Sequence, residues 1–216
     1  MRAPARLDHD ISLPPNPPYF IAGGAGFESE VAKVAELGWR ATPSAAFSIS
    51  VTAFRHAWSR LRSGQLPPDA QVQNMIEGTT HGVEGWLTWQ PTAVWRVSTG
   101  MTQLRQNLRV KAGSTDPTGP SALGNDPRHQ WLVRLSVNPA AGHELDIAMR
   151  RVAALPDPAV PAYSALDLRY ARQLTEGLTL AVIGRNLLDR RHAEFGVASG
   201  RGELARSVLW QLAWAL

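Results

Sequence analysis

The chain has 216 residues, a formal net charge of +4 and no cysteine, and this length suits one or two ordinary domains. The lack of cysteine excludes disulfides, zinc–cysteine sites and thiol chemistry. Hydrophobic residues make up 44% of the chain, which argues against a fully disordered protein. The positive charge comes mostly from arginines spread singly along the sequence, and this spread argues against a nucleic-acid partner.

Apolar residues recur at every second position over about nine segments, the period of a strand with one apolar and one polar face. In chain order the segments are 31–41, 45–58, 76–90, 93–109, 129–138, 143–152, 162–172, 178–189 and 203–216. In segment 143–152, Leu145 and Ile147 share one face, and Glu144 and Asp146 share the other. We therefore predict an all-β fold, an antiparallel up-and-down meander of about nine strands.

Short and long connections alternate between these segments. The short ones are 42–45, 90–93, 138–142 and 172–177, and the long ones are 59–73, 111–128, 153–162 and 190–202. A meander then has its tight turns at one end of the sheet and its long loops at the other. This asymmetry is typical of outer-membrane barrels, and a soluble sandwich does not need it.

Tryptophans on the apolar parity follow the turn type. Four lie within a few residues of a short connection or of the chain end, namely Trp39, Trp89, Trp95 and Trp214. We predict that they form an aromatic belt at one membrane interface, where the indole ring is buried and its N–H stays hydrated. Three aromatic residues near the long connections are predicted for the opposite interface, namely Trp58, Trp131 and Tyr163.

The polar parity carries charges of both signs, and we predict that it faces a lumen. The predicted lumen-facing residues are Glu36, Arg40, Glu84, Arg96, Arg134, Glu144, Asp146, Arg150, Asp167, Arg169 and Arg185. As a set they can line a polar path or grip a domain inside the lumen. The alternative is a cross-strand ladder of ion pairs that only keeps a wet wall soluble.

The stretch "LTLAVIGRNLLDRRHAEFG" (178–196) resembles the penultimate strand and final extracellular loop of TonB-dependent outer-membrane receptors, with Asn186, Leu187, Leu188 and Asp189 at the strand end. Further segments resemble the same family in the right order, namely 27–40, 74–91, 124–136 and 160–171. Together they cover nearly the whole chain from about Phe20 onward. In hydrocarbon every backbone polar group must be paired, so Asn186 and Asp189 are expected to close the strand at the outer interface.

The resemblance implies a place in the outer membrane of a Gram-negative cell, in contact with its lipid. Receptors of this family close a barrel of about 22 strands around a plug domain. The chain is therefore expected to be a partial, open barrel without the plug domain and without a TonB box. Residues 1–30 are expected to resemble an extracellular loop, and 31–216 to form the C-terminal portion of the barrel. The family's barrels end on an aromatic residue, whereas Leu216 ends this chain.

The resemblance also implies a function, uptake of a scarce nutrient such as a ferric siderophore or a cobalamin-like compound. In the intact receptor the expected partners are the plug domain, the TonB energy-transducing complex and a small-molecule or metal-chelate substrate. Two alternatives from other classes stay open. One is a soluble all-β binding module, a lectin-like sandwich with its apolar parity buried between two sheets. The other is a small pore-type barrel, which an odd number of strands disfavours.

Motifs for chemistry are missing from the sequence. The six histidines show no zinc-type spacing, and there is no nucleophile elbow, phosphate-binding loop or catalytic carboxylate pair. We therefore expect no enzyme activity, no cofactor and no resident metal. Two residues of the last long connection, His192 and Glu194, are weak candidates for contact with a metal-bearing substrate, and the alternative for both is a solvated loop.

Overall fold

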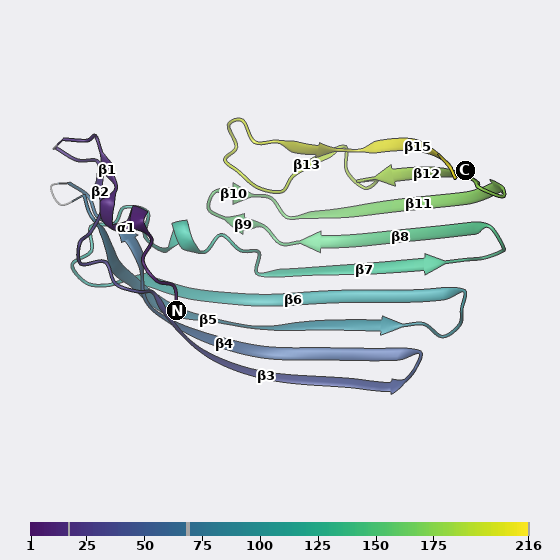
Figure 1. Cartoon of the computed structure of the whole chain (residues 1–216), viewed down its shortest axis with the longest axis horizontal. Coiled ribbons are helices and arrows are strands. Elements are labelled where there is room, and N and C mark those ends of the chain that lie inside the picture. Colours follow the sequence, from purple (N-terminus) through teal and green to yellow (C-terminus); the bar gives the residue numbers. More distant parts are fainter. Residues whose placement is uncertain (17, 68–69, 216) are drawn as a thin grey trace. The chain divides into compact units, whose positions relative to one another are not determined.

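The computed structural model describes residues 1–16, 18–67 and 70–215. Nine strands form one antiparallel sheet, in the order β15-β12-β11-β8-β7-β6-β5-β4-β3 (Figure 1). These strands are β3 (Val31–Ser44), β4 (Phe47–Gly64), β5 (Val72–Trp89), β6 (Trp95–Val110), β7 (His129–Val137), β8 (His143–Val152), β11 (Tyr163–Thr175), β12 (Leu178–Arg185) and β15 (Ser207–Trp214). The predicted nine-stranded meander is confirmed. Within the described residues the sheet is not closed, because β3 and β15 stand at its two ends.

Short elements occupy the N-terminal segment and the long connections. They are α1 (Arg6–Asp10), β1 (Ser12–Leu13), β2 (Ile21–Ala22), the 3-10 helix η1 (Gly119–Leu123), β9 (Leu155–Pro156), β10 (Ala159–Val160), β13 (Arg191–Ala193) and β14 (Glu203–Ala205). The six short strands pair as β1 with β2, β9 with β10 and β13 with β14. Among the described residues, no helix has the length and apolar character needed to cross a membrane.

Three predicted boundaries are wrong. Most of the predicted long connection 59–73 is strand, because β4 continues to Gly64 and β5 begins at Val72. Most of the side chains there are polar, with Leu61 and Val72 as buried exceptions, and the backbone keeps pairing. Side chains add to this pairing, since the Ser63 hydroxyl donates to the Gln73 carbonyl at 3.0 Å. Alternation of apolar residues predicts the buried or lipid-facing part of a strand and is silent about such a polar extension.

The other two wrong boundaries lie near the C-terminus. The segment 178–189 ends as a strand at Arg185, because Asn186 takes a positive φ of 51°. The segment 203–216 is two strands, β14 and β15, that meet at Arg206, and Leu216 lies outside the described residues. Glu203–Ala205 pairs with β13, and only the part from Ser207 onward pairs with β12.

The chain divides into two compact units. Unit 1 comprises residues 1–37, 53–82 and 104–125. Its interior includes Phe27, Val72 and Ile76, and it also buries one carboxylate, Asp8. Asp8 accepts from the Arg2 guanidinium at 3.0 Å and from the Ala5 amide at 2.8 Å. These hydrogen bonds, both to Oδ2, offset part of the cost of removing the carboxylate from water. The predicted domain boundary after residue 30 stays a prediction.

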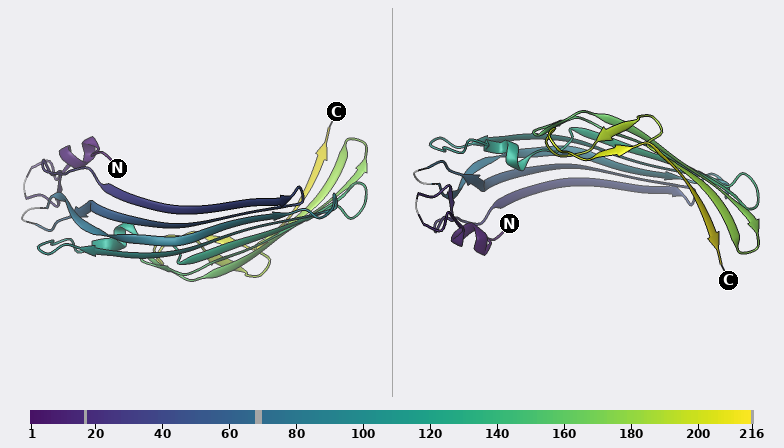
Figure 2. Two further views of the ribbon diagram at one scale, coloured as in Figure 1. Left: turned by 90° about the horizontal axis from the view of Figure 1, so that it is seen from below. Right: turned by 90° about the horizontal axis from the view of Figure 1, so that it is seen from above.

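Unit 2 comprises residues 38–52, 83–103 and 126 onward. It contains the four short connections, one of them the two-residue turn Glu176–Gly177, in which Gly177 has a φ of 84°. Its strands β7, β8, β11, β12 and β15 pair in an unbroken antiparallel series. Figure 2 shows these strands from two opposite sides.

Strand alternation and register give unit 2 two distinct faces. The apolar face includes Val133 opposite Met149, Ile147 opposite Leu168, and Val182 opposite Trp210. The polar face includes Ser136 opposite Asp146, and Asp146 opposite Arg169.

Candidate functional site

The polar face of unit 2 gathers most of the predicted lumen-facing residues. Register and alternation place seven of them on it across β6, β7, β8 and β11, namely Arg96, Arg134, Glu144, Asp146, Arg150, Asp167 and Arg169. Arg185 lies on the same face, because it comes two residues after Ile183, which lies opposite Arg169. That this face borders a lumen stays a prediction.

The remaining three lie on strands nearer the β3 end of the sheet. Arg40 on β3 and Glu84 on β5 belong to unit 2 and are exposed. Glu36 belongs to unit 1, where its carboxylate lies 3.6 Å from His56 Nε2.

Cross-strand contacts link the polar face into a ladder. The Arg169 guanidinium donates to Glu144 at 2.8 Å and to Asp146 at 3.3 Å. The Ser136 hydroxyl donates to the other oxygen of Asp146 at 2.7 Å. Three neighbouring strands, β7, β8 and β11, are thus joined by side chains as well as by backbone. Exposed pairs of this kind each contribute little to stability.

A hollow of about 310 Å³ lies on this face between β7, β8, β11 and β12. Charged residues of both signs line it, among them Arg134, Asp146, Asp167, Arg169 and Arg185. Such a lining offers both donors and acceptors to water or to a polar solute. Its chemistry suits a hydrated path better than a site for one fixed ion.

A second group of polar residues closes the end of β12 against the sheet. We call it the loop clamp, and it consists of Arg150, Tyr163, Asp167, Asn186, His192 and Glu194. Asn186 stands at its centre and is 4% exposed. Its amide N–H donates to Asp167 at 2.8 Å, and its side-chain N–H donates to the Leu204 carbonyl at 2.9 Å. Asn186 therefore fixes both the strand end and the returning chain.

Arg150 joins the sheet to the loop. Its guanidinium donates to Asp167 on β11 at 3.2 Å and to Glu194 in the loop at 3.0 Å. His192 is buried between Asn186 Oδ1 at 3.1 Å and Glu194 Oε1 at 3.2 Å. Its ring stacks on Tyr163 with a centroid separation of 4.1 Å. The clamp thus combines charge, hydrogen bonds and ring stacking.

Glu194 has a lowered pKa in this setting. Partial burial by itself raises the pKa, but hydrogen bonds with His192, Tyr163 and Arg150 outweigh it and hold the carboxyl below its ordinary value of 4.5. The carboxylate form is therefore the one that the clamp stabilises.

The clamp bears on one of the two interpretations of His192 and Glu194, that of a solvated loop. His192 is 8% exposed, and both side chains are engaged with other clamp residues, so the interpretation of a solvated loop is wrong for His192. Contact of the pair with a metal-bearing substrate stays a prediction. Across the described residues, no group of three or more metal-ligating side chains is arranged to hold a metal ion.

The strand-end motif, which consists of Asn186, Leu187, Leu188 and Asp189, also has a packing role. The Leu187 amide donates to the Leu166 carbonyl at 2.8 Å, and its side chain covers Gly184. Leu188 is exposed, and the Asp189 carbonyl accepts from the Arg206 guanidinium at 3.3 Å. The motif ends the strand through the positive φ of Asn186 and through these contacts.

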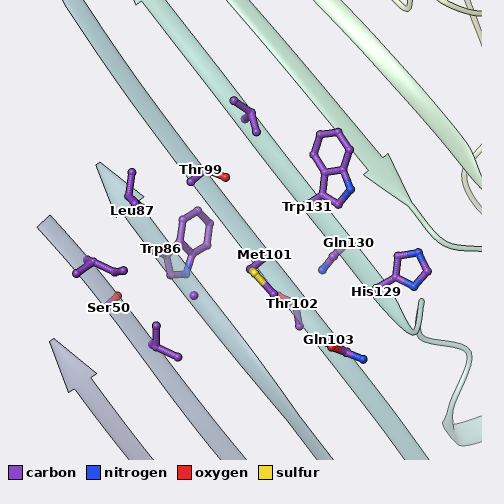
Figure 3. Close-up of a pocket in the computed structure, with 14 residues that line it drawn as sticks. Ser50, Trp86, Leu87, Thr99, Met101, Thr102, Gln103, His129, Gln130 and Trp131 are labelled. Carbon is purple, nitrogen blue, oxygen red and sulfur yellow. The ribbon is translucent and has the colours of Figure 1, made fainter. Parts of the chain in front are cut away.

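The apolar face is exposed, which is unusual for a sheet in water. The four predicted belt tryptophans are all exposed, namely Trp39, Trp89, Trp95 and Trp214. Of these, Trp95 lies opposite Val137 and Trp214 opposite Leu178 on the apolar face. A hollow of about 420 Å³ in this unit is lined by Met101 and Trp131, which lie side by side on neighbouring strands (Figure 3). The belt itself stays a prediction.

Two of the three residues predicted for the second belt have polar partners in the structure, and the second belt stays a prediction. Trp58 donates its indole N–H to Thr80 at 2.9 Å and packs against His56, the partner of Glu36 on the polar parity. Tyr163 packs on His192 within the loop clamp. Both rings are amphipathic, so they suit a polar surface with hydrogen-bond partners as well as a membrane interface. Trp131 does lie on the apolar face, opposite Met101.

The prediction also missed Trp86 on the polar face. Its ring covers Gly100, where a Cβ would collide with it. Gly100 lies opposite Leu132, and Leu132 lies opposite Arg150, a residue of the polar face. Counting two residues on from Glu84 gives this placement, so the signal was present in the sequence. The arrangement explains why glycine is needed at position 100.

Comparison with known proteins adds fold evidence to this geometry. No protein-family model and no curated protein matches the chain. Among solved structures, the FrpB iron transporter from Neisseria meningitidis is 12% identical, with a TM-score of 0.73 over 90% of this chain and 32% of that chain. The siderophore receptor PiuA from Acinetobacter baumannii is 19% identical, with a TM-score of 0.70 over 85% of this chain and 28% of that one.

A third structure agrees, the ferric yersiniabactin uptake receptor FyuA from Yersinia pestis, at 19% identity and a TM-score of 0.64 over 87% of this chain and 29% of that one. These structures are TonB-dependent outer-membrane receptors, and the chain spans about 30% of their length. The chain therefore has the fold of part of a TonB-dependent receptor barrel. The resemblance in the sequence is confirmed at the level of fold.

Proposed function

We propose that the chain forms part of the wall of an outer-membrane receptor that takes up a scarce nutrient, with a ferric siderophore as the first candidate and a cobalamin-like compound as the second. One observation carries the proposal. The sheet in unit 2 exposes large apolar side chains on one face, such as Trp210 and Leu212 on β15, and carries the ion-paired ladder around Arg169 on β11 on the other. Lipid outside and water inside satisfy both faces.

The polar face supports a route for a hydrated, hydrogen-bonding substrate. Its hollow mixes Arg134, Arg169 and Arg185 with Asp146 and Asp167. A mixed lining lets a polar chelate or a packed protein domain exchange hydrogen bonds with the wall. In the intact receptor we expect a plug domain against this face and the TonB complex as the energy source.

The two alternatives fit the same observations less well. A lectin-like sandwich needs a second sheet over the apolar face, but Val133 is 38% and Leu212 is 65% exposed, and the other described sheets have two strands each. A small pore-type barrel needs an even number of strands that closes on itself, whereas the described sheet has nine strands and two ends.

Deletion of the coding region in the source organism tests the proposal. Uptake of radioactive iron bound to a panel of chelators is measured in iron-starved cells, with labelled cobalamin as a parallel arm. We expect uptake of one ferric chelate to fall to background, while passive entry of a small sugar is unchanged. Unchanged uptake of every ferric chelate and of cobalamin would contradict the proposal, and loss of cobalamin uptake alone would select the second candidate.

A further inference from the structure

A cluster of arginines lies where the chain leaves β12 and where it returns into β15. Arg190 and Arg191 follow the strand-end motif, and Arg206 immediately precedes β15. Backbone pairing brings these positions together, since the Arg206 amide donates to the Arg190 carbonyl at 2.9 Å. Residues from two separate parts of the sequence thus meet at one point, and neither the ladder nor the loop clamp includes any of the three.

The three arginines line a hollow of about 460 Å³ together with Glu203 and Ala205. All three are exposed. Glu203 is the single carboxylate in the lining, and it lies 3.5 Å from Arg191. The Arg206 guanidinium donates to a backbone carbonyl, that of Asp189, rather than to a carboxylate. Within the described residues, three positive charges therefore face one negative charge.

The cluster lies directly beside the apolar face. β15 continues from Arg206 with apolar residues at alternate positions, namely Val208, Trp210, Leu212 and Trp214, all of them exposed. In register these four lie opposite Gly184, Val182, Leu180 and Leu178 of β12. A basic hollow thus stands at one end of an exposed apolar strip.

We propose that this hollow binds the phosphate group of a membrane lipid whose acyl chains lie along the apolar strip. This inference rests on the proposed membrane location. Arginine forks match phosphate oxygens in pairs, and clustered basic residues at a membrane boundary attract anionic headgroups. The apolar strip next to the cluster favours a lipid over a free phosphate ion. A free phosphate ion would contact the arginines alone and would leave the strip without a partner.

The test uses the full chain in phosphatidylcholine vesicles with or without phosphatidic acid. Lipids that co-purify with the inserted chain are quantified by mass spectrometry after detergent extraction. We expect phosphatidic acid to be enriched over phosphatidylcholine, and the double variant R190Q/R206Q to reduce that enrichment roughly tenfold. The matched control is R201Q, which removes the same charge from the same loop outside the hollow, where Arg201 donates to the Ala159 carbonyl at 3.1 Å; its enrichment should be unchanged.

A second measurement needs no variant. Phenylglyoxal modifies accessible arginines, and phosphatidic acid in the vesicles should protect Arg190 and Arg206 but leave Arg201 reactive, while inorganic phosphate at the same concentration should protect none of them. Equal protection by inorganic phosphate would identify a small-anion site and overturn the lipid assignment.

Two further results separate this inference from the proposed function. Insertion without any preference for phosphatidic acid, or a preference that R190Q/R206Q retains, would overturn this inference alone. Failure of the chain to insert into either kind of vesicle would contradict the membrane location and this inference with it.

Discussion

The two faces of the unit 2 strands share one backbone but contact their surroundings differently. On the polar face, side chains are tied to one another, as in the contacts from Arg169 to Glu144 and Asp146. On the apolar face, side chains such as Trp210 and Leu212 extend outward with most of their surface exposed. The stability of the sheet in unit 2 therefore depends on its surroundings. Side chains of the polar face bind one another, whereas side chains of the apolar face need an apolar partner outside the sheet.

The largest expected effect comes from a charge on the apolar face. Ile147 lies between Leu135 and Leu168, and its neighbour Ala148 lies between Arg134 and Asp167 on the polar face. We expect Ile147→Arg to lower the free energy of unfolding in phospholipid vesicles by about 2–4 kcal/mol, as for arginine at a bilayer midplane. The matched variant Ala148→Arg should cost much less. Urea titration of both variants checks this, and equal costs would contradict two distinct faces.

The second prediction concerns the residue that ends β12. Asn186 has a φ of 51°, and its side chain bonds both the Leu204 carbonyl and the His192 ring. We expect Asn186→Ala to lower the free energy of unfolding by roughly 2–3 kcal/mol, with about 1 from each lost hydrogen bond and about 1 from the left-handed backbone. Asn186→Gly keeps the backbone relaxed and should lose about 1 kcal/mol less. If the two variants unfold alike, the backbone explanation fails.

The third prediction concerns neighbouring arginines on opposite faces. Arg150 joins Asp167 to Glu194, whereas Arg151 donates to the Ser164 hydroxyl. We expect Arg150→Ala to weaken the loop clamp by roughly 1–2 kcal/mol and so to speed tryptic cleavage after Arg190 and Arg191 about 5- to 30-fold. Arg151→Ala should leave that rate unchanged. A rate that rises equally in both variants would argue that the loop opens independently of the clamp.

The smallest effect is a dependence on pH. The pKa of Glu194 is lowered in the folded chain, so its contribution is complete above its ordinary value of 4.5 and is lost as the pH falls through 4.5 toward the lowered value. Urea titrations from about pH 7 to about pH 3.5 should show this loss, and Glu194→Gln should show less of it. A variant with the same pH dependence as the native chain would assign the loss to other carboxylates.

The sequence was enough to predict the strands because alternation is strongest where a face must meet lipid or water. The series β7, β8, β11 and β12 begins within one residue of its predicted positions for that reason. The extension of β4 past Trp58 escaped prediction, because its backbone pairing needs no alternation of side chains. The fold could thus be predicted where the chain is amphipathic.

The candidate site could be predicted only in part. Alternation places Asp167 and Arg169 on one face, because the face of a residue follows from its position within its own strand. The loop clamp brings Arg150 and Glu194 together across 44 residues of sequence, and the basic hollow joins Arg191 to Arg206. Contacts of this range depend on how a long connection folds back, and that depends on the positive φ of Asn186, which no periodicity reveals.

The most direct test of the central claim is a cysteine scan along β8 in phospholipid vesicles. The native chain has no cysteine, so each single substitution from 143 to 152 introduces a unique thiol for a spin label. We expect collision with oxygen in the lipid at 145, 147 and 149, and collision with a water-soluble nickel chelate at 144, 146 and 148. A scan without alternation, or one with the opposite phase, would contradict the central claim.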